Sequence, residues 1–443
     1  MKKEIYLPYF ENKKVTVLGL GLLGRGIGDT QFLLENNAEV ICTDTRSEDK
    51  LAESISIITK KSPKNLKLII GENRFEDFEN KDFILTCAGM PIGYEYLEYA
   101  RAHNVPVYMS AALVCSIVMK HLPEVVIIGV TGTRGKTTTT ELIAHILREN
   151  GSRVNLGGNV RGVANLPLLK EIEDGDFLVL ELDSWQLQGF SDMRISPHIS
   201  VFTSFMDDHM NYYKNDREKY FNDKAHIYRN QHEGDILIAS EQARDEIIKR
   251  DPKISVVVPE DMQLDMKLIG KHNQTAGALA YEVTTQCGLD DESIRSAVAT
   301  FSAVHGRLED MGTIRGVRVF NDNNATTGDA TVAAIDSICE TFNKKPILIV
   351  GGTDKGLPID SLEQAITQKT KQTIYLSGTG TDRISLSKEF EYEDLKDCVQ
   401  RAFNIAEDGD IILFSPAFAS FSKYFNNEYE RNDMFVQYIE SVQ

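Results

Sequence analysis

The stretch VVIIGVTGTRGKTTTT, residues Val125–Thr140, decides the fold of the central part of the chain. Its apolar start, Val125–Val130, predicts a buried strand. A glycine turn, Gly-Thr-Arg-Gly-Lys-Thr at 132–137, follows this strand. Apolar residues then recur at helical spacing, at Leu142, Ile143, Ile146 and Leu147. A strand, a glycine turn and a helix N-terminus together favour phosphate binding, because backbone N–H groups and the helix dipole face the anion.

Within this loop, Lys136 is placed to reach the β- and γ-phosphates of a nucleotide, and Thr137 to offer its hydroxyl to Mg²⁺. The common phosphate loop has a glycine at the position of Val130, so this loop is a variant with Gly132 closer to the lysine. The alternative is a chance Gly-Lys-Thr in a surface turn. The strand before it and the helix after it favour the phosphate loop.

A second glycine turn, Gly19–Gly24, follows the apolar strand Val15–Gly19. About twenty residues later the strand Glu39–Thr43 ends in Asp44, which is the Rossmann spacing. This pattern predicts a nucleotide whose phosphates lie on the turn and whose ribose or base lies near Asp44. The alternative is an ordinary βαβ turn without a ligand. A further strand, Asp82–Thr86, leads to Gly89 at the same predicted edge.

Length and composition limit the classes of protein. A chain of 443 residues is long for one core and predicts two to four domains. The net charge of −18 argues against nucleic acid or an anionic membrane as a partner. The six cysteines form no CxxC pair, and no leader or membrane-spanning run is evident, so we expect a cytoplasmic protein without a zinc site.

Four more positions in the central region stand out. The strand Phe177–Glu181 ends in a carboxylate, where Mg²⁺ binds in open α/β sheets. His209 follows the strand Ile199–Ser204 and is either a ligand contact or structural. Asn159 ends a Gly-Gly-Asn turn that either approaches a ligand or simply reverses the chain. Lys224, judged from its spacing alone, is a solvated lysine. The single tryptophan, Trp185, is expected in the core.

A third region follows a linker near 301–310. Its strands are predicted at 317–320, 346–350, 373–376 and 411–414, with helical stretches between them, which favours a third, mostly parallel sheet. Each strand ends in a polar or glycine motif, so four loops form one wall of a site. The fold class is α/β with three domains: 1–109 Rossmann-like, 110–304 a phosphate-loop ATPase type, and 305–443 Rossmann-like.

Seven motifs occur in a specific order: Gly-Thr-Arg-Gly-Lys-Thr, Gly-Gly-Asn, Glu-Leu-x-Ser-x-Gln-Leu, Asp-His-Met, Gly-x-His-Asn, Asn-Asp-x-x-Ala-Thr and Ser-Pro-Ala-x-Ala-Ser. This series resembles the Mur ligase family over about residues 14–440. The Gly-Leu-Gly turn with Asp-Thr-Arg, and the Ser-Pro-Ala motif, resemble the D-glutamate-adding members. The resemblance implies ATP-dependent addition of D-glutamate to UDP-N-acetylmuramoyl-L-alanine through an acyl phosphate, by a cytoplasmic monomer in peptidoglycan precursor synthesis.

The resemblance also implies site residues. Lys136, His209 and Lys224 would be catalytic. Two Mg²⁺ ions would be held by Thr137, Glu181, His209 and a carbamylated Lys224. ATP would contact Gly132, Thr133, Gly135, Lys136, Thr137, Thr138, Asn273, Arg307 and Asp322. The UDP-substrate would contact Leu22, Leu23, Asp44, Thr45, Arg46, Gly89 and Asn159. D-glutamate would contact Thr326, Lys355, Ser420 and Phe421.

Four positions depart from the family pattern. Arg134 stands where the family usually has Asn, and Asp183 stands where many relatives have Ser. Asn324 stands where some relatives have a lysine, and Ala276 stands where an Asn is common. No pocket residue is assigned in 422–431, where the alignment shifts by one residue. The alternatives are a sister ligase using another amino acid, an NAD-dependent oxidoreductase using the first glycine turn, and a nucleotide-binding protein without catalysis.

Overall fold

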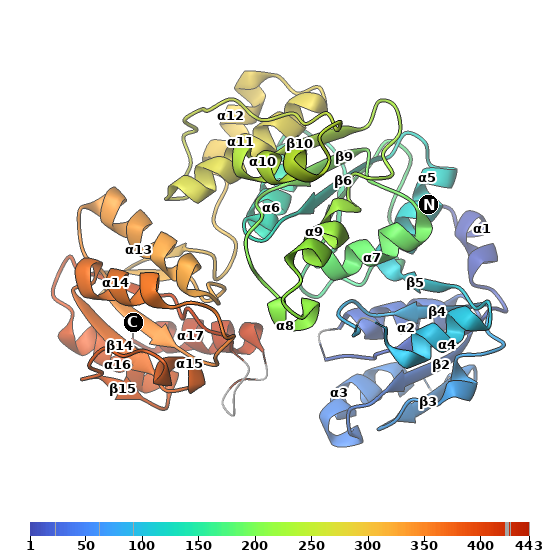
Figure 1. Cartoon of the computed structure of the whole chain (residues 1–443), viewed down its shortest axis with the longest axis horizontal. Coiled ribbons are helices and arrows are strands. Elements are labelled where there is room, and N and C mark those ends of the chain that lie inside the picture. The colour runs from blue at the N-terminus through green and yellow to red at the C-terminus, as the bar shows by residue number, and fades with distance from the viewer. Residues whose placement is uncertain (23, 62, 92, 421–424, 426, 443) are drawn as a thin grey trace. The chain divides into compact units, whose positions relative to one another are not determined.

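A computed structural model describes residues 1–22, 24–61, 63–91, 93–420, 425 and 427–442. The chain contains three largely parallel sheets, in its N-terminal, middle and C-terminal regions, which confirms the predicted fold class. Figure 1 shows the strands alternating with helices along the chain. Contacts group the chain into two compact units, 1–261 with 278–297 and 262–277 with 298–443. The domain boundaries at 109 and 304 stay a prediction.

The first sheet has the order β3-β2-β1-β4-β5, and all its pairs are parallel. Its strands are β1 Lys14–Leu18, β2 Glu39–Asp44, β3 Leu66–Ile70, β4 Phe83–Thr86 and β5 Val107–Met109. Its helices are α1 Lys3–Tyr6, α2 Arg25–Glu35, α3 Glu48–Thr59 and α4 Glu95–Ala102, with short 3₁₀ turns η1 Leu7–Tyr9 and η2 Phe75–Asp77. The strand order reverses at β1, so the turn after β1 lies at a switch point where ligands bind.

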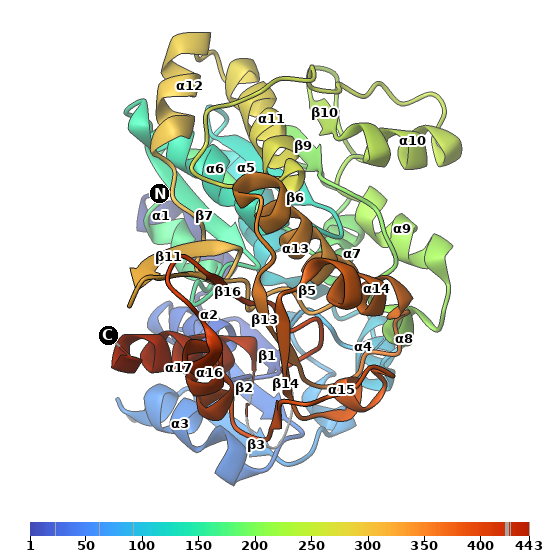
Figure 2. The ribbon, with the colours of Figure 1, turned by 90° about the vertical axis from the view of Figure 1, so that its left-hand side faces the viewer.

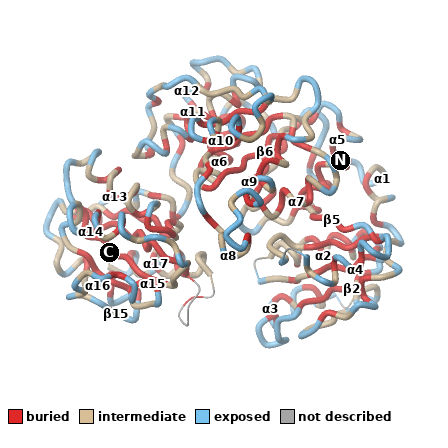
Figure 3. Tube along the Cα trace, viewed as in Figure 1, coloured by how far each residue is buried: buried red, intermediate tan, exposed pale blue. Residues whose placement is uncertain are grey.

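The second sheet has the order β10-β9-β6-β8-β7, also parallel. Its strands are β6 Val126–Thr131, β7 Val154–Gly158, β8 Phe177–Glu181, β9 Ile199–Phe202 and β10 Ile236–Ala239. Its helices are α5 Ser110–His121, α6 Lys136–Glu149, α7 Ser184–Met193, α8 Met210–Tyr213, α9 Arg217–Ala225, α10 Glu241–Arg250 and α12 Asp291–Thr300, with η3 Leu166–Lys170. The predicted apolar face of α6 is fully buried, and Figure 3 shows the buried run along β6.

The second unit contains a six-stranded sheet of order β11-β12-β16-β13-β14-β15. Only β11 is antiparallel, and it pairs with β12. Its strands are β11 Glu309–Ile314, β12 Val317–Asn321, β13 Ile347–Gly351, β14 Gln372–Leu376, β15 Glu391–Tyr392 and β16 Ile411–Phe414. Its helices are α13 Gly328–Phe342, α14 Asp360–Lys369, α15 Thr379–Asp382, α16 Leu395–Ile405 and α17 Glu428–Val442; α11 Lys271–Gln286 begins in this unit.

Two apolar cores cover the faces of this sheet. One joins α13 and α14 to one face, and the other joins α16 and α17 to the opposite face. Figure 2 shows α16 and α17 side by side. The predicted linker near 301–310 ends earlier than expected, because β11 already begins at Glu309. Across the described ranges of the chain, no helix combines the length and apolar character that a membrane span needs.

Candidate active site

The phosphate loop has the geometry that its glycines allow. Gly132 has φ +142°, and a side chain there would overlap the hydroxyl of Thr203 at the end of β9. Gly135, at φ +83°, is the N-cap of α6 and carries no capping side chain. The start of α6 therefore has the geometry of a helix N-terminus that binds an anion. Thr133 is fixed by Tyr220, whose hydroxyl lies 3.2 Å from the Thr133 hydroxyl.

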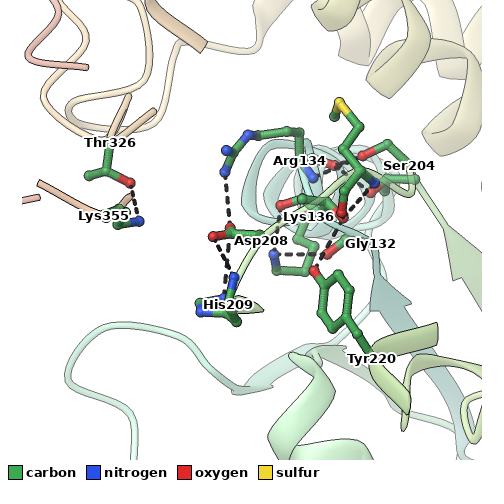
Figure 4. Close-up of polar contacts among 12 residues, drawn as sticks. Gly132, Arg134, Lys136, Ser204, Asp208, His209, Tyr220, Thr326 and Lys355 are labelled. Carbon is green, nitrogen blue, oxygen red and sulfur yellow. Dashed lines mark hydrogen bonds and ion pairs between the residues drawn. The ribbon is translucent and has the colours of Figure 1, made fainter. Parts of the chain in front are cut away.

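Two lysines converge on one carbonyl oxygen in this loop. The Nζ of Lys136 donates to the Gly132 oxygen at 3.0 Å, and the Nζ of Lys224 donates to the same oxygen at 2.8 Å. Figure 4 shows Lys136 folded back toward Gly132. Lys224 is 2% exposed, so the interpretation of it as a solvated lysine is wrong. Burial, followed by the charge of Lys136, holds the pKa of Lys224 well below its usual 10.5.

A carboxylate lies against the start of α6. The Thr137 hydroxyl donates to Glu181 Oε2 at 2.6 Å, and Asn159 Nδ2 donates to Glu181 Oε1 at 3.4 Å. A hydroxyl beside a carboxylate is the hard oxygen donor set that Mg²⁺ prefers. In the part of the chain that the structure describes, no group of three or more His, Cys, Asp or Glu side chains could hold a metal. Mg²⁺ here would complete its coordination with nucleotide oxygens and water.

Arg134 and His209 meet at one carboxylate. The Arg134 guanidinium lies 3.4 Å from Asp208 Oδ2, and His209 Nε2 lies 3.7 Å from the same oxygen (Figure 4). His209 has φ +56°, and its backbone N–H donates to Asp208 at 2.9 Å. Its ring packs on Trp185 with 4.6 Å between centroids. Trp185 is half-buried beside the site, and it packs against the apolar core of the first unit, as expected. The sequence analysis did not single out Asp208 as the residue that joins them.

Asp183, a departure from the family pattern, has a structural role. It is the N-cap of α7 and accepts a hydrogen bond from the Gln186 backbone N–H at 2.8 Å. The Gln186 side chain reaches back to the Asp183 N–H, which completes a capping box. Asp and Ser are both strong N-cap residues, so either preserves this helix start.

The predicted UDP-binding residues gather around the first glycine turn. Asp44 Oδ2 accepts the Gly21 N–H at 3.2 Å and the Arg46 guanidinium at 3.2 Å. Leu22 is 47% exposed on this turn, and Thr45 lies between Asp44 and Arg46 just after β2. Gly89 follows β4, and a Cβ atom added to it would lie 3.5 Å from the Trp185 ring. Leu23 lies outside the described residues.

In the second unit, Asp322 follows β12 and is buried. It accepts the Leu308 N–H at 3.0 Å and the Ser415 hydroxyl at 2.8 Å. Burial raises the pKa of Asp322 from 3.8 to about 7. Asn273, on α11, donates to the Ile269 carbonyl at 2.8 Å. Arg307 lies close enough to Asp322 to lower its pKa in part.

The four motif loops of this unit are linked to one another. Lys355 Nζ donates to the Thr326 hydroxyl at 3.0 Å (Figure 4). Backbone hydrogen bonds join 325 to 417, 352 to 380 and 353 to 419. Ser420 is 2% exposed at the end of this cluster. Asn324 donates its side-chain N–H to the His305 carbonyl at 3.3 Å. Phe421 lies outside the described residues.

Sequence reasoning missed Arg431, which lies on α17 and is 0% exposed. Its Nε donates to Asn323 Oδ1 and its Nη2 to the Asn323 carbonyl, both at 2.8 Å, and its Nη1 to the Phe418 carbonyl at 3.2 Å. This arginine therefore ties two motif loops together. Its partners lie about a hundred residues away or across an irregular loop, so no local pattern indicated it.

Fold and site together define an α/β nucleotide-binding protein with a phosphate loop at the switch point of its middle sheet. The family model "Mur ligase middle domain" matches residues 130–259, and the model "Mur ligase, glutamate ligase domain" matches 306–418. The chain belongs to the Mur ligase family.

The curated relatives are full-length matches. A UDP-N-acetylmuramoylalanine–D-glutamate ligase of Borreliella burgdorferi is 30% identical, and the match covers 98% of this chain and 99% of the relative. The enzyme of the same name from Roseiflexus sp. is 31% identical, and the match covers 97% of this chain and 98% of the relative. The one from Koribacter versatilis is 32% identical, and the match covers 94% of this chain and 95% of the relative.

Solved structures share the fold. UDP-N-acetylmuramate–alanine ligase of Thermotoga maritima has a TM-score of 0.63 at 17% identity, covering 97% of this chain and 100% of its own. A MurF ligase of the same organism, in complex with ADP, has a TM-score of 0.63 at 16% identity, and the match covers 100% of this chain and 99% of that ligase. These likenesses support the fold of all three sheets.

Proposed function

We propose that this chain is an ATP-dependent ligase that adds D-glutamate to UDP-N-acetylmuramoyl-L-alanine in the cytoplasmic synthesis of peptidoglycan precursors. The convergence of Lys136 and Lys224 on the phosphate loop, beside the Thr137–Glu181 pair, supports the ATP-dependent class. Relatives of that name, matched over nearly the whole chain, support the choice of D-glutamate.

The reaction has two bond-forming steps. A carboxylate oxygen of the substrate attacks the γ-phosphorus of ATP, ADP leaves, and an acyl phosphate forms. The D-glutamate amine then attacks the acyl carbon, phosphate leaves from the tetrahedral intermediate, and the amine loses a proton. In the first step both reactants are anions, so Lys136 lowers the barrier by offsetting their repulsion.

Thr137 and Glu181 are the residues that would hold Mg²⁺ at the nucleotide. When bound, Mg²⁺ offsets phosphate charge as a Lewis acid. His209 and a carbamylated Lys224 are the proposed ligands of a second ion. His209 already lies beside Asp208, a carboxylate that can orient its ring.

The surroundings of Lys224 support its proposed carbamylation. Burial favours the neutral amine, which is the form that can attack CO₂. The neutral amine nitrogen forms a bond to the CO₂ carbon and loses one proton, so an uncharged side chain becomes a carbamate with one negative charge. The change places an anionic group beside the Lys136 ammonium at the Gly132 carbonyl, and it creates oxygen ligands that an ammonium cannot offer.

In the second unit, Lys355 and Thr326 are proposed to bind the D-glutamate carboxylates, with Ser420 and Phe421 at the same pocket. Asn273, Arg307 and Asp322 are proposed contacts of ATP. At the first glycine turn, Asp44, Thr45 and Arg46 are proposed to bind the uridine. We also propose that the enzyme is a monomer.

The first experiment measures phosphate release from ATP by the purified protein with Mg²⁺ and UDP-N-acetylmuramoyl-L-alanine, with and without D-glutamate. The product is identified by mass. Release that needs both substrates, with a product heavier by one glutamyl unit, is the expected result. Release with a different amino acid would instead identify a sister ligase, and binding of ATP without turnover a nucleotide-binding protein.

Lys136→Ala should lower turnover by at least about a hundredfold, the scale of removing one preorganised charge from a transition state. Lys61→Ala, which removes a lysine that is 88% exposed, is the matched control and should leave the rate unchanged. A near-native rate for Lys136→Ala would refute the proposed role of that lysine.

Lys224→Ala should be inactive and should regain activity when a short carboxylic acid is added, because the acid supplies the missing carboxylate. Lys61→Ala is again the control, and the same acid should not accelerate it. Full activity of Lys224→Ala without added acid would contradict the carbamate.

A further inference from the structure

A continuous line of side-chain hydrogen bonds runs from the first glycine turn to the phosphate loop. Arg25, the first residue of α2, donates from Nη1 to Asn159 Oδ1 at 2.7 Å. Asn159 Nδ2 donates to Glu181 Oε1 at 3.4 Å, and the Thr137 hydroxyl donates to Glu181 Oε2 at 2.6 Å. Each carboxylate oxygen of Glu181 thus receives one hydrogen bond, and Arg25 lies at the start of the line.

The position of Arg25 is set by close packing of α2 rather than by a loose surface contact. Gly28 and Asp29, three and four residues further on, lie on the same side of the helix. A side chain at Gly28 would overlap Ala164, so the helix approaches that segment closely. The Asp29 carboxylate accepts the Leu166 N–H at 2.8 Å in a buried contact. The helix face that carries Arg25 is therefore docked on the segment that follows Asn159.

Chemistry fixes the direction of the Asn159 amide. A guanidinium can only donate, and an ionised carboxylate can only accept. Asn159 must therefore turn Oδ1 toward Arg25 and Nδ2 toward Glu181. Its backbone N–H also donates to the Glu181 backbone carbonyl at 2.7 Å. Asn159 is therefore bound to Glu181 through both its backbone and its side chain.

We propose that Arg25 is a positioning residue for the Mg²⁺ site: through Asn159 it orients the Glu181 carboxylate. The inference rests on the proposed Mg²⁺ site at Thr137 and Glu181. A carboxylate already held by two hydrogen bonds needs less reorganisation to bind a metal, and loss of such outer partners commonly weakens metal affinity about 10- to 100-fold. Arg25 is only half-buried and does not contact Glu181 itself, so its effect is indirect.

The test measures ADP binding to the full chain by calorimetry, with and without Mg²⁺ and with no UDP-substrate present. The readout is the Mg²⁺ enhancement, the ratio of the dissociation constants without and with the ion. Arg25→Leu should reduce this enhancement about tenfold and leave metal-free ADP binding unchanged. Asn159→Ala should do the same, and the double variant should lose no more than the larger single effect, because both act along one line.

Arg101→Leu is the matched control. Arg101 lies on α4 and contacts Asp192 on α7 at 3.4 Å, so it also joins elements of the two sheets of this unit, away from Glu181. It should keep the full enhancement. Arg25→Lys keeps a cation at the start of α2 and loses the planar guanidinium, so it should fold as the native chain does and show a partial loss.

Full enhancement in a folded Arg25→Leu or Arg25→Lys, a stronger enhancement, or additive losses in the double variant would each overturn the inference while leaving the proposed Mg²⁺ site intact. If native protein showed no Mg²⁺ enhancement, the proposed Mg²⁺ site would fall, and the role of Arg25 with it. The two failures are therefore distinguishable.

Discussion

Asp322→Asn should remove a specific pH dependence from the stability of the second unit. Burial raises the pKa of Asp322 to about 7 in the folded chain, against 3.8 when unperturbed. Because the folded value is the higher one, protonation favours the folded state. The stabilisation is fully present below pH 3.8 and is lost as the pH rises through about 7.

The magnitude follows from linkage. Between the two pKa values each pH unit changes the free energy of unfolding by about 1.4 kcal/mol, so lowering the pH from 7 to 5.5 adds about 2 kcal/mol. Asparagine has no charge to lose. Its Oδ1 can still accept the Leu308 N–H, and its Nδ2 can donate to the Ser415 hydroxyl, so the local contacts of Asp322 are preserved.

The assay is hydrogen exchange of the β12 and β16 amides in the full chain, corrected for intrinsic rates, at both pH values. The difference in opening free energy between pH 5.5 and 7 should be about 2 kcal/mol smaller in Asp322→Asn than in the native chain. Trp185 lies in the first unit, so its fluorescence during urea denaturation measures the stability of that unit. This measurement is the internal control, because the substitution lies in the second unit. Equal pH dependence in both proteins would refute the reasoning.

Two further substitutions test positions where the structure assigns a structural role. Asp183→Ala should lower the free energy of unfolding of the first unit by about 1 kcal/mol, whereas Asp183→Ser should change it by less than half as much, because serine also caps a helix. Urea denaturation followed by Trp185 fluorescence measures both changes. Equal losses in the two variants would contradict the capping role. Arg431→Met should destabilise the second unit by about 3 kcal/mol or more, since buried acceptors lose charged donors. If the β12 and β16 amides of this variant exchanged hydrogen at the native rate, the hydrogen bonds of Arg431 would contribute little to stability.

Sequence patterns predicted the strands that carry the site and missed several at sheet edges. The apolar runs of β1, β6, β8 and β16 are buried on both faces, and such runs are the clearest strand signal. By contrast β7 (VNLGG) ends in two glycines, and β11 (EDMGTI) is an antiparallel edge strand with an irregular register. Both lack the continuous apolar run that made the central strands recognisable.

The candidate site was predictable where its chemistry is local. Gly132, Lys136 and Thr137 lie within six residues, so one motif specified their arrangement. Lys224 was not predictable from its spacing, because the Gly132 carbonyl that it contacts lies 92 residues earlier. Arg431 had the same difficulty, with a partner 108 residues away. Only the family resemblance singled out Lys224, and nothing singled out Arg431.

The net charge of −18 is compatible with substrates that are themselves anionic, because the relevant charges are local. At physiological ionic strength, exposed charges are screened beyond about 8 Å, so distant surface carboxylates contribute little to the field at the phosphate loop. Lys136, Arg134 and Arg25 instead lie on or beside the two glycine turns, within hydrogen-bond or ion-pair distance of their backbone or adjoining side chains. The proposed carbamate on Lys224 fits the same logic. It would make the interior of the site less positive at the proposed metal positions and would leave these three cations at the turns that are proposed to bind phosphate.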